Sequence, residues 1–575
     1  MEDVHSPLEL YRDSLKDLHA QRTSEFFECL AGQANIDQDA NAALVAKIRD
    51  IEASIAASSG RNNVWKILRV AMVIGSVGCV VMAVMSHPVW LIGAVALVAA
   101  LLVKLNSIIR EISTRLQHLK ELRDEKESLA WAQMEPLNRL YDWSIFASLV
   151  HKTLPTIQLD PFFTRGRLTN LCTSFGFDDS FSDSRSVKFA HSGLISGNPF
   201  VLAQTVNHWI GTKTYHGSLS INWTEHQRDS QGRSTTVSRH QTLHASVEKP
   251  FPEYANEATL IYGNRAAPDL SFSRMPSSLS GLENGVISNW RKNHAIRKLE
   301  AKSRKISDGK GFTVMANREF DALFSATDRD HEIQFRLLFT PLAQQEMLKL
   351  LKDKELGFGD KFAFVKTGMI NKVESGPLNE RDLSADPRNF RFYDFAQAEK
   401  FFNAYHNDLF RAFFFSFAPI LVIPLYQQER PAEEIYAGIL QEPSCSWEHE
   451  GIANYVGEGE FAHPASITRN ILKTESDETP DGAQIVQVTA HGFRGVDRVD
   501  HVSVAGGDGR NHGVAVRWVQ YIPVKQTSQL LVCDPAPEDA HRSDLQLHAW
   551  HDRFANHGIG SEHAFARRSI VAAML

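Results

Sequence analysis

The longest apolar pattern in the chain lies near its N-terminus. Val70–Val103 forms 34 consecutive positions without a charged side chain, interrupted only by Ser86, His87 and Pro88. A transmembrane helix needs about 20 apolar residues, and a proline suits the first turn of a second helix. The pattern therefore predicts a transmembrane helical hairpin over residues 65–105. One long tilted span, a re-entrant hairpin and a buried core hairpin are the alternatives.

Basic residues flank this segment on both sides, and the connecting turn has none. The positive-inside rule then places both ends in the cytoplasm. The apolar run begins too far along the chain for a cleavable signal peptide. We therefore expect a multi-pass protein of the cytoplasmic (inner) membrane. The residues expected to anchor the helices at the membrane interface are Trp65, Lys66, Arg69, Trp90 and Lys104.

Apolar residues on both sides of the hairpin recur at heptad spacing. The two stripes are Leu44, Ile48, Ile51 and Ile55 before it, and Leu105, Ile109, Ile112, Leu116 and Leu119 after it. They predict helices that extend the hairpin as an antiparallel stalk. The same stripes could instead form a coiled coil between protomers or pack on the rest of the chain.

From about residue 161 the pattern becomes β-like. Phe200–Gly211, Lys213–Glu225 and Thr235–Lys249 are rich in β-branched and aromatic residues, and Ser218–Thr224 alternates between polar and apolar. Arg228–Arg233 has the composition of a hairpin tip. These segments predict an antiparallel meander with one buried face.

The following region mixes both types of element. Glu332–Phe339 and Phe358–Val365 are predicted as strands, and Thr340 followed by Pro341 is a start signal for a helix. Asp394–Phe417 is predicted as an aromatic-rich helix. Its ten phenylalanines, counted over residues 388–425, indicate a buried core helix rather than a lipid groove or a third membrane contact.

The C-terminal part contains short strand candidates and a possible helix. Ala483–Thr489, Gly513–Tyr521 and Ser528–Val532 are the strands, with a turn at Gly506–Gly509. Leu545–Leu575 is predicted to be helical.

These patterns predict an α+β fold: an N-terminal transmembrane hairpin with a helical stalk, a cytosolic body of mainly antiparallel β-sheet with packed helices, and a smaller β-rich C-terminal region with a helical tail. The expected segments are 1–64 (N-terminal helical segment), 65–105 (hairpin), 106–140 (stalk), 141–440 (body) and 441–575 (C-terminal region).

Composition narrows the function classes. The chain has 575 residues and a formal net charge of −7, which is too mild to indicate a nucleic-acid partner. Five cysteines are scattered without a ligand spacing, which favours reduced thiols. We expect no cofactor.

A basic stretch, Arg291–Lys310, is a candidate contact for anionic inner-leaflet lipid, where each basic residue contributes about 1 kcal/mol. A solvated helix face is the alternative. The residues expected at the membrane surface are Arg291, Lys292, Arg297, Lys298, Lys302, Arg304 and Lys305.

No catalytic or metal-binding motif is found. The pair Cys445 and His449, the alternating Asp328, Asp330 and Glu332, and the histidines of the tail all lack a recognised ligand spacing. Phosphate-loop, nucleophile-elbow and zinc-protease motifs are absent from the sequence. The catalytic residues, if there are any, stay unknown, and no metal site is predicted. The tail histidines are His541, His548, His551, His557 and His563.

Several stretches resemble a family of uncharacterised bacterial membrane-anchored proteins with an N-terminal transmembrane hairpin and a large cytosolic domain. They are Gly211–Glu225, Gln241–Pro252, Leu260–Asn264, Leu270–Arg274, Asp328–Glu355 and Pro424–Pro431. The resemblance implies an architecture and a membrane location, and it implies no activity.

The leading hypothesis is a membrane-anchored, cytosol-facing scaffold or binding module. Its expected partners are the lipid bilayer and either further copies of the chain, as a homo-oligomer, or a cytosolic protein. A membrane-bound enzyme or effector acting on lipid or nucleotide, or an oligomeric pore, are the alternatives.

Overall fold

The computed structural model describes residues 5–85, 91–93, 96, 98, 105–182, 184–228, 234–277, 294, 296–298, 313–428, 442–478, 483–534, 564–568 and 570–575. They form two compact units, each built from separate stretches of chain. The first comprises Met1–Arg22, Asp142–Ala385 and Asn407–Leu575, and the second comprises Thr23–Tyr141 and Asp386–His406. The expected division into five consecutive segments stays a prediction.

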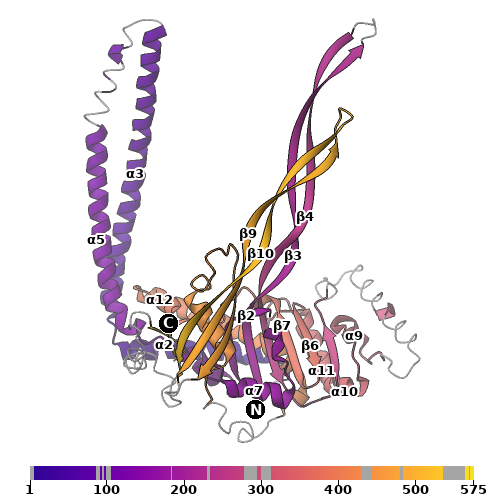
Figure 1. The fold of residues 1–575 in the computed structure, drawn as a ribbon. Coiled ribbons are helices and arrows are strands. Elements are labelled where there is room, and N and C mark those ends of the chain that lie inside the picture. The colour runs from indigo at the N-terminus through magenta and orange to yellow at the C-terminus, as the bar shows by residue number, and fades with distance from the viewer. Residues whose placement is uncertain are drawn as a thin grey trace. The chain divides into compact units, whose positions relative to one another are not determined.

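The first unit contains a seven-stranded antiparallel sheet with the strand order β1-β2-β3-β4-β7-β6-β5 (Figure 1). Its hairpin between β2 and β3 turns at Ser196 and Gly197, whose φ angles of 47° and 77° suit a two-residue turn that matches the strand twist. The strands are β1 (Ile157–Leu159), β2 (Arg185–Ile195), β3 (Asn198–Arg228), β4 (Ser234–Gly263), β5 (Ser271–Arg274), β6 (Phe362–Thr367) and β7 (Ile370–Ser375).

A second antiparallel sheet in the same unit has five strands in the order β11-β12-β10-β9-β8. Alternate residues of β9 and β10 are buried at the sheet base, where they pack against helix α14 (Ser446–Val456). The strands are β8 (Ile471–Glu478), β9 (Gln484–Ala505), β10 (Asn511–Cys533), β11 (Ala564–Arg567) and β12 (Ile570–Met574).

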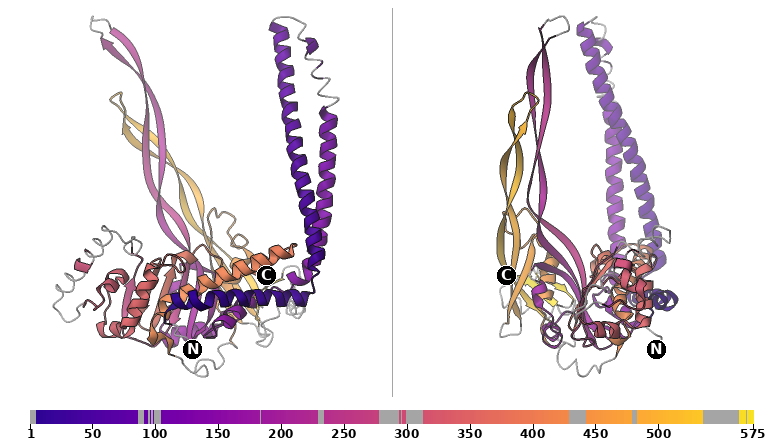
Figure 2. Two further views of the ribbon diagram at one scale, coloured as in Figure 1. Left: turned by 180° about the vertical axis from the view of Figure 1, so that it is seen from behind. Right: turned by 90° about the vertical axis from the view of Figure 1, so that its right-hand side faces the viewer.

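Two pairs of strands are much longer than the sheets that they leave. β3 pairs with β2 only as far as Asn207, and β4 pairs with β7 only from Thr259, yet β3 and β4 stay paired with each other out to Arg228 and Ser234. β9 and β10 extend in the same way. Figures 1 and 2 show the two ribbons rising side by side from the sheets.

Short helices cover the sheets of the first unit. Its aromatic core includes the end of α12, where Phe413 and Phe417 contact each other and Phe417 meets Phe200 of β3 edge-on. The helices are α1 (Pro7–Leu10), α6 (Ser144–Thr153), α7 (Arg165–Phe175), α9 (Arg318–Phe324), α10 (Glu332–Leu338), α11 (Pro341–Lys352) and α14, with α2 (Lys16–Ala34) and α12 (Phe395–Leu421) running across the unit boundary.

In the second unit, the long helices α3 (Gln38–Met85) and α5 (Asn106–Asn138) pack side by side. Two buried asparagines connect their base to the segment that precedes α12. Asn41 donates to the carbonyl of Tyr393 (3.0 Å) and accepts from the Phe395 amide, and Asn138 donates to the carbonyl of Phe392 (3.1 Å). The predicted helices on both sides of the apolar segment are thus present.

The membrane predictions are contradicted. Across the residues that the structure describes, no helix combines the length and the apolar character needed to span a membrane. Within α3, the uncharged part begins after Arg69 and covers only 16 residues, Val70–Met85, which is short of the length of about 20 that a span requires. The second expected helix, Val89–Val103, lies largely outside the described residues. This corrects the expected multi-pass membrane location and leaves the transmembrane hairpin unsupported.

The α+β fold with antiparallel sheets is confirmed for the body, as are the helix start at Thr340 and the turn at residues 506–509. Glu332–Phe339 was predicted as a strand and is instead the helix α10, capped by the His331 side chain, which accepts from the Gln334 amide. In the predicted helical tail, the described residues form the strands β11 and β12, because their apolar side chains complete the second sheet.

Candidate functional site

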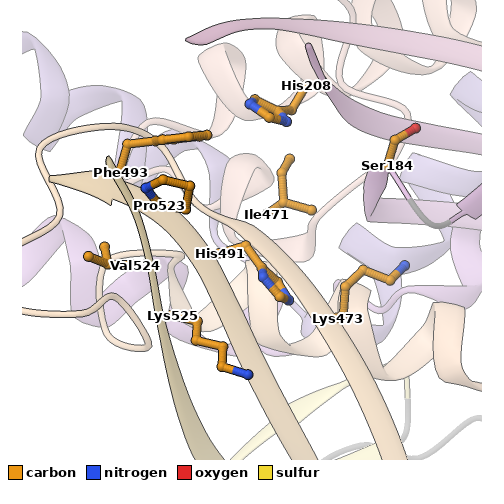
Figure 3. Close-up of a pocket in the computed structure, with 10 residues that line it drawn as sticks. Ser184, His208, Ile471, Lys473, His491, Phe493, Pro523, Val524 and Lys525 are labelled. Atoms are coloured by element: carbon orange, nitrogen blue, oxygen red, sulfur yellow. The ribbon is translucent and has the colours of Figure 1, made fainter. Parts of the chain in front are cut away.

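An open cleft of about 510 Å³ lies where the two ribbons leave their sheets (Figure 3). One side comes from the first sheet, and the other comes from β8, β9 and β10 of the second. We call it the basic cleft. Its lining residues are Ser184, His208, Ile471, Lys473, His491, Gly492, Phe493, Pro523, Val524 and Lys525.

The lining carries positive charge and no carboxylate. Lys473 forms an ion pair with Glu450 (2.5 Å) and donates to the carbonyl of Arg185 (3.1 Å), so its ammonium is held in place behind the cleft wall. Lys525 stands at the exposed rim and has no ion-pair partner among the described residues. Since no acidic side chain lines the cleft, its field favours an anion.

The two histidines of the cleft differ in their surroundings. The ring of His208 lies 5.3 Å from that of Phe493, and partial burial lowers the pKa of His208 below its usual value. Desolvation lowers the pKa of His491 too, and the ammonium groups of Lys525 and Lys473 lower it further. At neutral pH both rings are therefore uncharged hydrogen-bonding groups.

One polar atom of the lining is unsatisfied. The Nε2 atom of His208 is buried and has no hydrogen-bond partner among the described residues. A buried polar atom without a partner costs about 1–3 kcal/mol. The hydrogen-bonding capacity of this atom is therefore unused within the described part of the folded chain.

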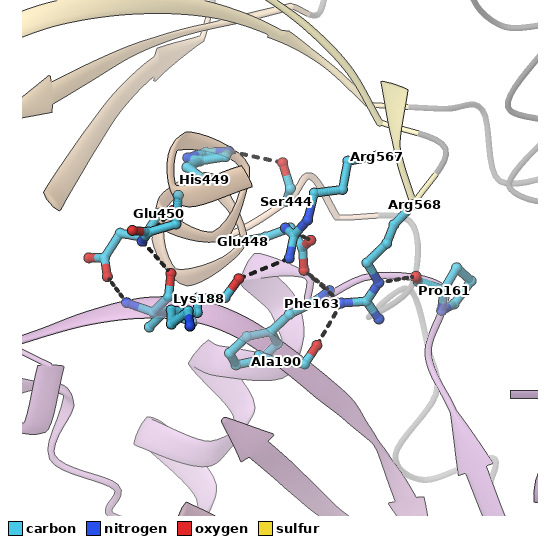
Figure 4. A network of polar contacts seen from close by, with 12 residues as sticks. Pro161, Phe163, Lys188, Ala190, Ser444, Glu448, His449, Glu450, Arg567 and Arg568 are labelled. Atoms are coloured by element: carbon cyan, nitrogen blue, oxygen red, sulfur yellow. Dashed lines mark hydrogen bonds and ion pairs between the residues drawn. The ribbon is translucent and has the colours of Figure 1, made fainter. Parts of the chain in front are cut away.

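A buried ion network lies deeper in the same unit (Figure 4). The carboxylate of Glu448 on α14 accepts from Arg567 (3.1 Å), from Arg568 (3.0 Å) and from the amide of Phe163 (3.1 Å). Arg568 also donates to the carbonyls of Ala190 and Pro161. The network thus joins α14, the first sheet and the end of β11, and its role is to hold these parts together.

Glu450, two residues along α14, connects this network to the basic cleft. Its carboxylate accepts from the Val187 amide (2.8 Å) and pairs with Lys473. Burial raises its pKa to about 7, against the lowering effect of the Lys473 ammonium. The charge behind the cleft wall therefore changes near neutral pH.

Ser444 and His449 make a contact that resembles a nucleophile and its base. Ser444 Oγ and His449 Nε2 are 2.9 Å apart, but both residues have no exposed surface. Burial lowers the pKa of His449 to about 3, and the nearby Asp534 accepts from Ser444 and Gln484 instead of His449. No substrate can reach this pair, so it is a structural contact.

The structure brings few of the sequence-predicted site residues together. Cys445 is buried, and its thiol pKa lies well above the usual value because of burial. Asp328, Asp330 and Glu332 accept from the backbone amides of Ser273, Ser271 and Thr313, so they stabilise chain turns. In the part of the chain that the structure describes, no group of three or more His, Cys, Asp or Glu is placed to hold a metal ion.

The predicted membrane contacts are only partly visible. Trp65 is half-buried on α3, where Lys66 and Arg69 are exposed, and Arg297 and Lys298 are exposed in a short helical stretch. The membrane-surface role of the basic stretch stays a prediction. The residues outside the described part are Trp90, Lys104, Arg291, Lys292, Lys302, Arg304, Lys305 and the tail histidines His541, His548, His551, His557 and His563.

Sequence reasoning missed both the basic cleft and the ion network. His208 and His491 are 283 positions apart in the chain (491 − 208), and each lies inside a strand without a motif around it. Arg567 and Arg568 did carry a signal, because two adjacent arginines interrupt an apolar stretch. Such a pair indicates buried charges only once a partner such as Glu448 is known.

Comparisons of the chain with protein-family models, with curated protein sequences and with solved structures gave no match. The family resemblance described from the sequence therefore stays a prediction.

Proposed function

We propose that this protein is a binding module that attaches to another protein through an arm made of its two β-ribbons. The paired-ribbon arm comprises residues 209–228 and 234–258 of β3 and β4, together with residues 492–505 and 511–529 of β9 and β10. The observation that carries the proposal is that these long strands leave both sheets and pack on each other.

A small apolar core holds the two ribbons together. Ile221 and Leu243 of one ribbon pack with Val514 of the other, and Val514 is fully buried. The backbones approach closely at Gly217, since a Cβ atom built there would lie 2.3 Å from the Ala515 carbonyl oxygen. An isolated two-stranded hairpin is marginally stable in water, so this packing gives the arm a defined structure.

Polar contacts between the ribbons add to this core. Lys249 pairs with Asp500 (2.6 Å) and lies over the ring of Trp518 at 4.4 Å. At the tip of the shorter ribbon, the Gly507 amide donates to the Gln241 side chain (2.7 Å). The ribbons therefore behave as one element.

The face of the β3–β4 ribbon that is turned away from the β9–β10 ribbon carries polar side chains that pair across the two strands. Asn222 contacts His240 (2.7 Å), and Ser220 contacts Thr242 (3.3 Å). The outer strand edges of the arm have no neighbouring strand among the described residues. Unpaired edges are the usual template for adding a strand from another polypeptide. These features support an extended protein segment, or a second copy of the arm, as the partner.

The other hypotheses have less support. The pore hypothesis depended on membrane-spanning helices, and none is found in the described part of the chain. For an enzyme, the contact that most resembles a catalytic pair is the one between Ser444 and His449. Among the described residues, the basic cleft has no carboxylate, and the Ser444–His449 contact is inaccessible.

The test is to shorten the arm. A variant that replaces Asn222–His240 by an Asn-Gly turn joins Ile221 to Gln241, which already face each other across the ribbon. We expect the full-length protein to form a defined oligomer or a stoichiometric complex in light scattering and native mass spectrometry. We expect the shortened protein to lose it.

The control is the body itself, which must keep its circular dichroism spectrum and thermal unfolding midpoint in the shortened variant. A full-length protein that is monomeric and has no stoichiometric partner contradicts the proposal. So does a shortened protein that retains the same complex.

A further inference from the structure

We infer that the basic cleft at the foot of the paired-ribbon arm binds a small organic anion, a carboxylate or a phosphate monoester attached to an apolar or aromatic group. Its lining shares Gly492, Phe493, Pro523, Val524 and Lys525 with the base of the arm, but the inferred ligand is a different molecule from the arm's protein partner. Its volume of about 510 Å³ falls within the range of about 300–1,000 Å³ that is typical of small-molecule sites.

The charge of the cleft selects the ligand's acidic group. Lys525 stands at the rim without an ion-pair partner among the described residues, and Lys473 is fixed by Glu450 and the Arg185 carbonyl. His491 stands near both ammonium groups, as shown in Figure 3. An anion placed here gains a charge-assisted interaction with Lys525 and meets no carboxylate of the lining.

The rest of the lining selects an apolar body. Ile471 is buried, and Phe493, Pro523 and Val524 supply further apolar surface. The buried, unpartnered Nε2 of His208 lies on the opposite side of the cleft from Lys525, as Figure 3 shows. A ligand in the cleft therefore has its charge near Lys525 and its apolar part on Phe493.

Phenyl phosphate is a suitable probe, because it combines a phosphate with an aromatic ring. Benzyl alcohol lacks the charge, and inorganic phosphate lacks the ring. Isothermal titration of the full-length protein should give binding of phenyl phosphate at least tenfold tighter than of either comparison compound. Equal binding of benzyl alcohol and phenyl phosphate overturns the charge argument, and equal binding of inorganic phosphate overturns the apolar one.

Substitution of the rim lysine gives the second measurement. Lys525→Gln should weaken phenyl phosphate binding about tenfold or more, because the variant lacks the rim ammonium that pairs with the phosphate. Lys361→Gln, which changes an exposed lysine outside the lining, is the matched control and should leave binding unchanged. Both positions are exposed, so both variants should fold.

Histidine NMR supplies a readout that does not depend on the strength of binding. The lowered pKa of His491 should rise when phenyl phosphate binds, because the anion offsets the field of Lys525 and Lys473. The signal is assigned with His491→Gln. No binding of phenyl phosphate, or binding that leaves both the histidine titration and the Lys525→Gln affinity unchanged, overturns the inference. Loss of the arm's protein partner in the shortened variant is a separate result and does not bear on this site.

Discussion

Glu448→Gln is the substitution that tests the buried ion network most directly. Glu448 is 1% exposed and is the only carboxylate, among the described residues, that pairs with both Arg567 and Arg568, whose side chains are 3% and 5% exposed. Glutamine has nearly the same shape but no charge. The change therefore removes the negative charge that Glu448 places beside two buried guanidinium groups.

The size of the effect follows from the geometry. Removing one partner of a buried ion pair costs about 3–5 kcal/mol. Both arginines keep other acceptors, the carbonyl of Lys188 for Arg567 and those of Ala190 and Pro161 for Arg568. We therefore expect the lower end, about 3 kcal/mol, which corresponds to roughly a 100-fold change in an equilibrium constant.

Hydrogen exchange measures this effect locally, since a chain of this length need not unfold in one step. Amides of β11, β12 and α14 should exchange roughly 100-fold faster in Glu448→Gln than in the wild type. The control is Glu135→Gln, which breaks the pair with Arg139, an exposed pair with side chains 55% and 71% accessible. Exposed pairs contribute about 0–1 kcal/mol, so this control should change exchange less than about fivefold.

A triple substitution should rescue the protection that Glu448→Gln loses. Replacing Glu448, Arg567 and Arg568 together by methionine removes the three charges of this ion network and should recover most of the lost protection. If the amides of β11 and β12 exchange within threefold of their wild-type rates in the Glu448→Gln variant, the ion network does not stabilise these strands and the expected effect of about 3 kcal/mol is wrong.

Two further predictions follow from the same unit. The pKa of Glu450 is about 7 in the folded protein and near 4.5 in the unfolded chain, so between these pH values only the folded protein holds the proton. The free energy of unfolding therefore falls as the pH rises from 4.5 to 7, by up to about 3 kcal/mol. In thermal unfolding, the Glu450→Gln variant should lose less stability than the wild type over this pH range. Identical pH profiles for the two proteins would refute the raised pKa of Glu450. Gly217→Val should separate the ribbons and raise exchange in the arm, because the added side chain meets the Ala515 carbonyl. Ser218→Val, at the neighbouring exposed position, should leave the arm intact, and equal exchange in the two variants would contradict the packing.

Local patterns predicted part of this fold correctly. Thr340 and Pro341 started a helix as expected, because the capping hydroxyl and the fixed proline φ act within one turn of the chain. The heptad stripes predicted the helices α3 and α5, because apolar residues at this spacing fall on one face of a helix. Alternation in Ser218–Thr224 predicted a strand with one covered face, and Leu219, Ile221 and Trp223 do face the second ribbon.

Other predictions from pattern were wrong where the environment decides. EIQFRLLF has β-type composition, yet it is helical, since its Phe335, Leu338 and the following Phe339 pack into an aromatic core with Phe272 and Phe324. The apolar run after Arg69 predicted a membrane span, and no helix in the described part of the chain meets the requirements for one. An apolar run specifies a preference for burial but does not specify the surface that buries it.

The sequence by itself determined the α+β class, the antiparallel meander and the positions of the long helices, because helix capping, periodicity and turn residues act over a few positions. Only the tertiary structure decided that the β3–β4 and β9–β10 ribbons pack on each other as an arm, that His208 and His491 line one cleft, and that Glu448 pairs with Arg567 and Arg568. These contacts join residues that are more than 100 positions apart. Burial and charge pairing depend on distance in space, which no local pattern in the chain records.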